Sequence, residues 1–253
     1  MIKPNECVII GGGNSINEGI SLGLKDILKD KFVIACNYGF KFFPHTLTCF
    51  VDRDFYYPSQ DCIKNKTHPY IYDELKKEPL IVGYDTNGVS EFKLPNTILL
   101  KGNGHYNKQP LMNGFYHPFL CGIYALSLAQ FLLDYNGTIY LLGYDWTMRK
   151  KEDVDPKKYK SRDININTHF YSDKELNHQG QHYLGAFENH DPDYYFKYFI
   201  ESNITIYNVS KQSNINNFEK ICYADMFKKL NFNRYNQLEL REYIKNKLDC
   251  HSQ

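Results

Sequence analysis

Cys7-Val8-Ile9-Ile10-Gly11-Gly12-Gly13-Asn14-Ser15 is a short apolar run, rich in β-branched residues, that breaks into three glycines and then reaches a serine. This pattern predicts a buried strand that turns sharply into a helix beginning near Ser15. Glycines let the backbone approach a phosphate without a Cβ in the way, and the first N–H groups of a helix point toward such an anion. The pattern therefore indicates a phosphate site formed by Gly11, Gly12, Gly13, Asn14 and Ser15.

The glycine turn differs from the dinucleotide fingerprint G-x-G-x-x-G, because Ile16 stands where the third glycine would fall. The turn thus favours a nucleotide phosphate without specifying NAD. Ser15 followed by Glu18 fits a capping box, in which both side chains bond free backbone N–H groups at the start of the helix. An ordinary tight turn between a strand and a helix, with no ligand, is the alternative explanation of the same glycines.

Predicted strands and helices alternate along the rest of the chain. Apolar residues recur at helical spacing from Ile16 to Leu28, which predicts one amphipathic first helix. Near the C-terminus we expect a helix over residues 234–248, with Leu238, Tyr243 or Ile244, and Leu248 on its buried side. Further strands are predicted at 32–36, 47–51, 79–84, 97–100, 137–142 and 204–208, and further helices at 118–133 and 191–200. This alternation predicts an α/β fold, a Rossmann-like doubly wound, mostly parallel sheet in a single domain over residues 1–253.

The composition of the chain argues against several classes of protein. Lys and Arg number 30 against 29 Asp and Glu, and a formal charge of +1 gives no overall field that would attract nucleic acid. The seven cysteines are widely spaced without a C-x-x-C pair, which is typical of a reducing cytosol. No apolar stretch reaches the length of about 18 residues that a membrane span needs. We therefore expect a soluble, cytoplasmic protein; peripheral membrane contact and the oligomeric state stay open.

Polar residues follow several predicted strands at the point where each strand ends. Asn37 follows the second strand, Asp52 and Asp54 follow the third, and Tyr144 and Asp145 follow the strand at 137–142. Ligands of open parallel sheets bind outside the carboxyl ends of the strands, so we expect these residues to contact a nucleotide. The D-x-D pair Asp52/Asp54 offers the oxygen ligands that Mg²⁺ or Mn²⁺ prefers. A turn role for Asn37 and chance spacing of the two acids are the alternatives.

From about residue 147 to 185 the composition changes to Lys, Asp, Asn and Thr with few aliphatic residues. Long loops in compact domains are usually functional. We therefore predict a lid at the carboxyl edge of the sheet. A surface excursion without a role is the alternative.

Short motifs occur in a fixed order along the chain. They are Gly11-x-Gly13-x-Ser15, Cys36-Asn37, Cys121-Gly122-Ile123-Tyr124, Ile139 to Trp146, and His182-Tyr183-Leu184-Gly185. Their order and rough spacing resemble the bacterial lipooligosaccharide sialyltransferases of glycosyltransferase family 42, and the related Rossmann-like proteins that include methanogen pterin pyrophosphokinases.

The resemblance implies that a nucleotide sugar binds with its phosphate at the glycine turn and its nucleoside near Asn37, Cys121 and Gly122. It also implies that His182 is the general base that deprotonates the acceptor hydroxyl. The chain departs from the family pattern at Gly12, Asp52 and Thr147, where the family has asparagine, asparagine and tyrosine. An acid at position 52 hints at a nucleoside diphosphate sugar held through a metal.

These observations predict a transferase that moves a sugar, of a sialic acid-like kind, from a CMP- or UDP-type donor to a glycan or other hydroxyl acceptor with inversion. Two alternatives stay open: a metal-dependent pyrophosphokinase or other phosphotransferase, and a nucleotide-binding protein without activity. His178 and His182, four residues apart, would also suit a metal site on a helix, but Gly180 between them disfavours a helix. A structural role for His182 is the remaining alternative to its role as a base.

Overall fold

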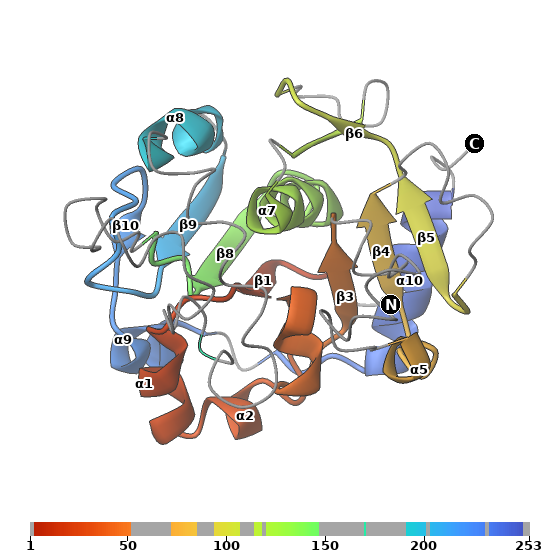
Figure 1. Cartoon of the computed structure of the whole chain (residues 1–253). Coiled ribbons are helices and arrows are strands. Elements are labelled where there is room, and N and C mark those ends of the chain that lie inside the picture. Colours follow the sequence, from red (N-terminus) through yellow and green to blue (C-terminus); the bar gives the residue numbers. More distant parts are fainter. Residues whose placement is uncertain are drawn as a thin grey trace, which may run out of the picture.

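An eight-stranded sheet runs through the middle of the molecule, with helices on both of its faces (Figure 1). The computed structural model describes residues 3–51, 72–84, 94–106, 114–117, 120–146, 170, 191–200, 203–230 and 233–249. The strands, in chain order, are β1 (Glu6–Ile10), β2 (Val33–Cys36), β3 (Leu47–Phe50), β4 (Ile81–Tyr84), β5 (Thr97–Leu100), β8 (Gly137–Leu142), β9 (Ile204–Asn208) and β10 (Glu219–Lys220). A separate two-stranded sheet is formed by β6 (Gly102–Asn103) and β7 (Phe115–Tyr116).

The direction in which the chain adds strands to the sheet reverses between β1 and β8, and this place is called the switch point. The spatial order is β10-β9-β8-β1-β2-β3-β4-β5, and the described strand pairs are all parallel. The chain therefore moves outward from β1 to β5 on one side and outward from β8 to β10 on the other. Ile10 ends β1 between Ala35 of β2 and Leu142 of β8, so β1 and β8 flank the switch point. This doubly wound, Rossmann-like α/β arrangement confirms the predicted fold class.

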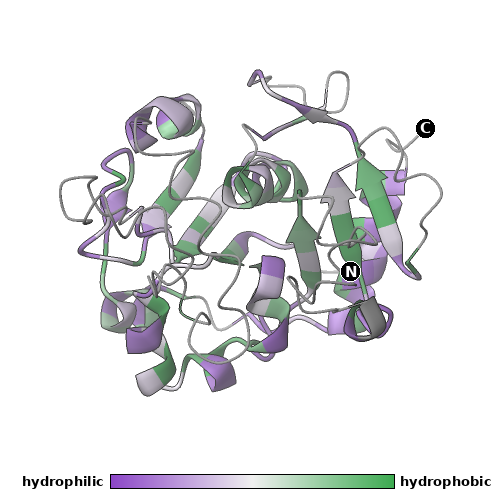
Figure 2. Cartoon of the chain, in the orientation of Figure 1, coloured by the Kyte–Doolittle hydropathy of each residue, from purple (hydrophilic) through white to green (hydrophobic). Residues whose placement is uncertain are grey.

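Two apolar cores lie on the two faces of the sheet, because successive residues of a strand point to opposite sides. In β1, Cys7 and Ile9 belong to one core, and Val8 and Ile10 belong to the other. Figure 2 shows the apolar colouring concentrated in the strands and in the central helix. The helices are α1 (Ile16–Ser21), α2 (Leu24–Ile27), η1 (Asn37–Lys41), α5 (Tyr72–Leu75), α7 (Cys121–Leu132), α8 (Pro192–Phe196), η3 (Lys197–Phe199), α9 (Tyr223–Lys229) and α10 (Gln237–Asp249).

The helices divide between the two cores. The α7 and α10 helices contribute to the core that contains Cys7, and α1, α2 and α9 contribute to the core that contains Val8. Nearly all of α7 is buried, as its continuous apolar sequence predicts. Within the parts of the chain that the structure describes, none of the helices combines the length and the apolar character needed to cross a membrane.

Two details of the predicted helices are wrong. The first helix is interrupted at Gly23, whose φ of +85° ends α1 and precedes α2. In α10 the buried residues are Leu240, Ile244 and Leu248, whereas Leu238 is 76% exposed. The buried residues are spaced by four, as one face of a helix requires, and they face the edge of the sheet near β5.

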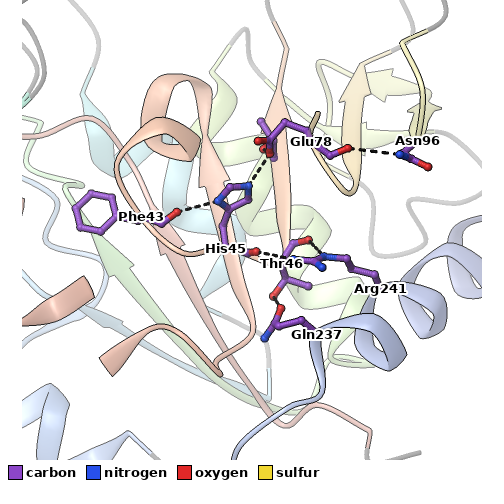
Figure 3. Close-up of polar contacts among 8 residues, drawn as sticks. Phe43, His45, Thr46, Glu78, Asn96, Gln237 and Arg241 are labelled. Atoms are coloured by element: carbon purple, nitrogen blue, oxygen red, sulfur yellow. Dashed lines mark hydrogen bonds and ion pairs between the residues drawn. The ribbon is translucent and has the colours of Figure 1, made fainter. Parts of the chain in front are cut away.

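A network of polar side chains joins α10 to the amino edge of the sheet (Figure 3). Arg241 donates from Nε to the carbonyl oxygen of Thr46, at 2.9 Å, and from Nη2 to that of His45, at 3.1 Å. The Nε2 atom of His45 lies 2.5 Å from Oε2 of Glu78. The hydroxyl of Thr46 also donates to Oε1 of Gln237, at 2.9 Å. These contacts tie α10 to the segment that leads into β3.

Candidate functional site

Two loops meet at the switch point, where β1 and β8 end. The first loop is the glycine turn, Gly11 to Ser15, and the second is the β8 loop, Gly143 to Trp146. The N–H of Gly11 donates to the carbonyl oxygen of Leu142 at 2.7 Å, and the N–H of Gly13 donates to that of Gly143 at 2.8 Å. The two loops are therefore joined along their backbones directly beyond the sheet.

Close approach of the two loops explains the glycines within them. A Cβ on Gly13 would lie 2.5 Å from Oδ2 of Asp145 and 2.7 Å from the carbonyl oxygen of Gly143. A Cβ on Gly11 would lie 2.9 Å from that same carbonyl oxygen. Gly143 has a φ of +68°, which disfavours any residue with a side chain. The space beside these glycines, where the sequence analysis predicted a phosphate, is filled by the β8 loop.

The side chain of Asp145 binds the end of the glycine turn. Its Oδ2 accepts from the N–H of Ser15 at 2.8 Å, and its Oδ1 accepts from the Ser15 hydroxyl at 2.5 Å. Asp145 is only 5% exposed. The predicted capping box is wrong, because the hydroxyl of Ser15 serves Asp145 and makes no cap bond to α1. A carboxylate thus occupies the start of α1, where an anion is favoured.

A residue of the predicted lid also contacts the glycine turn. The N–H of Phe170 donates to the carbonyl oxygen of Gly12 at 2.9 Å, and its ring packs edge-on against Phe42 and Phe43. The carbonyl oxygen of Asn14 accepts from the N–H of Asn17 at 3.0 Å. Phe170 is the part of residues 147–185 that the structure describes, so the rest of the lid prediction lies outside the described residues.

Asn37 lies at the carboxyl end of β2, next to the end of β1. It has a φ of +50°, a left-handed conformation that residues with side chains adopt uncommonly. Its side-chain oxygen is buried, and within the described residues no donor lies in hydrogen-bonding distance of it. Buried polar atoms are rarely left without a partner, so this oxygen calls for an explanation.

Tyr144 points from the β8 loop into the core beside three buried cysteines. Its hydroxyl donates to the carbonyl oxygen of Gly122, at 2.7 Å, at the start of α7. Burial, and then the nearby thiols of Cys36 and Cys121, raise the pKa of Tyr144 well above its usual value. The thiol of Cys121 donates to the carbonyl oxygen of Cys49 at 3.1 Å. The predicted residues Tyr144, Cys121 and Gly122 therefore do come together, with the tyrosine hydroxyl bonded inside the protein.

Two thiols of this cluster, those of Cys36 and Cys49, are poorly suited to nucleophilic attack. A hydrogen bond with Cys121 and burial raise the pKa of Cys36 well above its usual value. Burial also raises the pKa of Cys49. Because the thiolate is the reactive form, these cysteines behave as small apolar residues.

Three polar residues that the sequence analysis did not select hold the β8 loop in place. Asn208 and Ser213 both donate to the carbonyl oxygen of Tyr144, at 3.1 Å and 2.6 Å. Asn214 donates from its backbone to the carbonyl oxygen of Asp145, at 2.9 Å, and from its side chain to that of Trp146, also at 2.9 Å. Asn208 could have been selected from the sequence, because it is a polar residue at the end of the predicted strand 204–208, much as Asn37 is a polar residue directly after the second strand.

Trp146 ends the β8 loop in a left-handed conformation, with a φ of +48°. Its ring lies 5.9 Å from the ring of Tyr195 and 6.0 Å from that of Phe196, measured between centroids. Asp191 starts this helical segment as predicted, because its side chain accepts from the N–H of Asp193 at 2.9 Å. The β8 loop is thus packed between the glycine turn and the aromatic residues of α8.

The remaining predicted site residues are not tested by the structure. His182, Asp52 and Asp54 lie outside the described residues, as does His178. Among the residues that are described, no group of three or more His, Cys, Asp or Glu side chains could hold a metal ion.

The carboxyl edge at β1, β2 and β8 therefore gathers a strained asparagine with a buried oxygen, a glycine turn held by a carboxylate, and a tightly fixed loop. The glycine turn and the loop are bonded to each other, and the side-chain oxygen of Asn37 can accept a hydrogen bond from a polar ligand. Comparison with known proteins yields no match to the chain, whether with a family model, a curated protein or a solved structure.

Proposed function

We propose that this protein binds a nucleotide at the carboxyl ends of β1, β2 and β8, and that it is a glycosyltransferase with a nucleotide-sugar donor. Asn37 is the observation that carries the proposal. Its φ of +50° and its buried, unbonded side-chain oxygen are unfavourable features in one residue at the end of β2, one strand away from the switch point. A ligand that donates a hydrogen bond, such as the amino group of a base or a ribose hydroxyl, would satisfy this oxygen.

The position of Asn37 in the sheet supports a ligand rather than a simple turn. In doubly wound sheets, ligands bind in the crevice where the strand order reverses. Asn37 follows β2, and the strand beside it, β1, borders that reversal. Gly11 to Ser15 follow β1 and Asp145 follows β8, so they belong to the loops that such ligands contact.

The assignment of sugar transfer rests on the ordered motifs that resemble family 42 glycosyltransferases. In this proposal His182 takes the proton of the acceptor hydroxyl, and the hydroxyl attacks the sugar as the donor phosphate departs. Direct displacement of this kind needs a base and stabilisation of the leaving phosphate, with no covalent intermediate. If the donor is a nucleoside diphosphate sugar, Asp52 and Asp54 are the proposed ligands for Mg²⁺ or Mn²⁺.

Thermal unfolding with a panel of ligands tests the binding part of the proposal. CMP, UDP and their sugar conjugates are added with Mg²⁺, with Mn²⁺ or with excess chelator. A ligand that binds only the folded state stabilises it by about 2.7 kcal/mol at a concentration of 100 times its Kd. We expect at least one of these nucleotides to raise the Tm, and release of free sugar from the same conjugate would support transfer activity.

An Asn37→Gly variant tests whether Asn37 contacts the nucleotide. Glycine accepts a positive φ at no steric cost, so the apo protein should be as stable as the wild type or more so. Loss of the side-chain amide should lower nucleotide affinity by about tenfold, the value of one hydrogen bond to a ligand. The measurement is the nucleotide-dependent rise in Tm of variant and wild type.

Asn96 offers a matched control, because it also has a positive φ, of +56°, but precedes β5 at the opposite edge of the sheet. Unlike Asn37, Asn96 donates from its side-chain amide to the carbonyl oxygen of Glu78, at 3.5 Å, so Asn96→Gly should lower apo stability relative to Asn37→Gly and leave nucleotide affinity unchanged. Equal nucleotide stabilisation of Asn37→Gly and the wild type would reduce Asn37 to a turn residue.

A further inference from the structure

Four hydrogen-bond donors of the glycine turn are used within the protein. The N–H groups of Gly11 and Gly13 donate to carbonyl oxygens at the end of β8 and in the β8 loop, at 2.7 Å and 2.8 Å. The N–H and the hydroxyl of Ser15 both donate to the carboxylate of Asp145, at 2.8 Å and 2.5 Å. Groups of the kind that bind a phosphate in other glycine turns therefore have protein acceptors here.

The atoms that lie against the turn are oxygens of the β8 loop. A Cβ on Gly13 would lie 2.5 Å from Oδ2 of Asp145 and 2.7 Å from the carbonyl oxygen of Gly143. Asp145 is 5% exposed, and solvent and salt screen a buried charge only weakly. A phosphate at the turn would therefore be repelled by a buried carboxylate that already takes two of the donors.

Asn37 offers a further acceptor on the neighbouring strand. It comes two residues after Ala35, which pairs with Ile10 at the end of β1, and Gly11 comes directly after Ile10. Adjacent strands lie about 4.8 Å apart, so the chain leaves the sheet at Asn37 close to the start of the glycine turn. The side-chain oxygen of Asn37 is buried and, among the described residues, has no donor. The group that complements this oxygen on a ligand is a hydrogen-bond donor.

We propose that Asp145 is a specificity-determining residue whose carboxylate keeps phosphate out of the glycine turn. The site then recognises the nucleoside part of its ligand, through a hydroxyl or amino group that donates to Asn37. Ribose hydroxyls and the amino group of cytosine are such donors, whereas a phosphate presents acceptor oxygens and negative charge. This specificity rests on the proposed function, because it assigns which part of a nucleotide the site recognises.

Matched pairs of ligands on the wild-type protein test which part of the nucleotide is recognised. Cytidine is compared with CMP, and uridine with UDP, by the rise in Tm that each produces. A phosphate held by the turn would strengthen binding by about tenfold or more, the value of one charge-assisted hydrogen bond. We expect each nucleotide to bind less than about tenfold more tightly than its nucleoside. A larger ratio in both pairs would overturn the proposal.

Asp145→Asn tests the exclusion of phosphate without any nucleotide. The amide keeps the size of the side chain, removes its charge and leaves one acceptor oxygen for the two donors of Ser15. One donor of Ser15 then faces the N–H of the new amide, and an anion can accept from both. Inorganic phosphate should therefore raise the Tm of the variant by more than it raises the Tm of the wild type, with chloride at equal ionic strength as the reference.

Glu78→Gln is the matched control for the loss of a buried charge. Glu78 is also a buried carboxylate with two side-chain partners, Thr48 and His45, but it lies at the amino edge of the sheet. Phosphate should change the Tm of this variant and of the wild type equally. An equal response of folded Asp145→Asn and the wild type would overturn the proposal. If circular dichroism shows that Asp145→Asn is unfolded, the ligand pairs on the wild type decide.

The proposed function and the role of Asp145 fail by different results. If neither the nucleosides nor the nucleotides raise the Tm of the wild type, the proposed function fails and recognition of a nucleoside fails with it. If CMP or UDP raises the Tm while cytidine and uridine do not, nucleotide binding is supported and the specificity assigned to Asp145 is wrong.

Discussion

Gly13 has to be a glycine because another part of the same chain lies against it. The carboxylate of Asp145 and the carbonyl oxygen of Gly143 take up the space that a Cβ would need. The same contact brings Asp145 to Ser15 across 130 positions of the sequence. The fold alone therefore requires a glycine at this position, whether or not the turn binds a phosphate.

Gly13→Ala should therefore destabilise the protein even without a ligand. Forcing a methyl group into this contact displaces the β8 loop, and overpacking of this kind costs about 1–3 kcal/mol. Chemical denaturation of the apo protein measures the loss. Gly104→Ala is the control, because nothing lies within 4 Å of a Cβ at that glycine. If Gly13→Ala is as stable as the wild type, the contact between the two loops is not as tight as the structure has it.

The sequence identifies some of these residues without their neighbours. Gly11, Gly13 and Asn37 are recognisable because each follows the end of a predicted strand, and the structure has the two glycines after β1, at the switch point, and Asn37 after the neighbouring strand β2. The hydrogen bonds from Ser15 to Asp145 could not be predicted from the sequence, because they form only when β8 pairs with β1. The buried hydroxyl of Tyr223, which has no hydrogen-bond partner within the described residues, could not be predicted either, because the sequence does not show whether a tyrosine on the apolar face of a helix has such a partner.

At the scale of elements, α10 shows how polar contacts fix a helix that its apolar face alone would leave free to shift. Nδ1 of His45 lies 2.8 Å from the carbonyl oxygen of Phe43, which can only accept, so Nδ1 carries a proton. Nε2 of the same ring lies 2.5 Å from Oε2 of Glu78. Thr48 donates to the same oxygen of Glu78. Arg241 then joins α10 to this fully bonded group through the carbonyl oxygens of His45 and Thr46.

Arg241→Ala should loosen α10 from the sheet. It removes two hydrogen bonds from a charged donor and leaves two carbonyl oxygens without that donor, a loss of about 1.5–3 kcal/mol. Urea denaturation measures the loss of stability. Leu238→Ala in the same helix is the control, since Leu238 is 76% exposed and its truncation should change stability by less than about 0.5 kcal/mol. A large loss in Leu238→Ala with none in Arg241→Ala would mean that α10 packs by a different face.

Element positions were largely predictable where an apolar run is bounded by turn residues. The strands at Thr97–Leu100, Gly137–Leu142 and Ile204–Asn208 agree with the prediction residue for residue. The two-residue strand β10 has no pattern to recognise. The first helix was predicted as continuous because its apolar spacing runs through Gly23, and spacing does not register a backbone break.

At the scale of the whole molecule, a ligand site has to be assigned to one of the two edges of the sheet. At the amino edge, the side chains of His45, Glu78, Thr46 and Arg241 bond one another and nearby backbone groups. At the carboxyl edge, Asn37 keeps an unbonded oxygen and two residues with side chains, Asn37 and Trp146, adopt left-handed conformations. The amino edge has such features too, because Asn96, Asp134 and Tyr135 have a positive φ, and within the described residues Oγ1 of Thr97 and the hydroxyl of Tyr135 have no hydrogen-bond partner. The carboxyl edge is favoured for a ligand because ligands of doubly wound sheets bind outside the carboxyl ends of the strands, where the strand order reverses.

Trp146 allows this location to be tested directly, because it is the single tryptophan of the chain. It follows Asp145 in the β8 loop and packs against Tyr195 and Phe196, so a ligand at the switch point should change its surroundings. We expect a nucleotide that raises the Tm also to change the tryptophan emission, with the same Kd by both measurements. Trp146→Phe, which keeps an aromatic ring, should remove the emission signal and retain most of the rise in Tm. A nucleotide that stabilises the protein while the emission stays constant to saturation would have to bind away from the β8 loop, and the switch point would then not be its site.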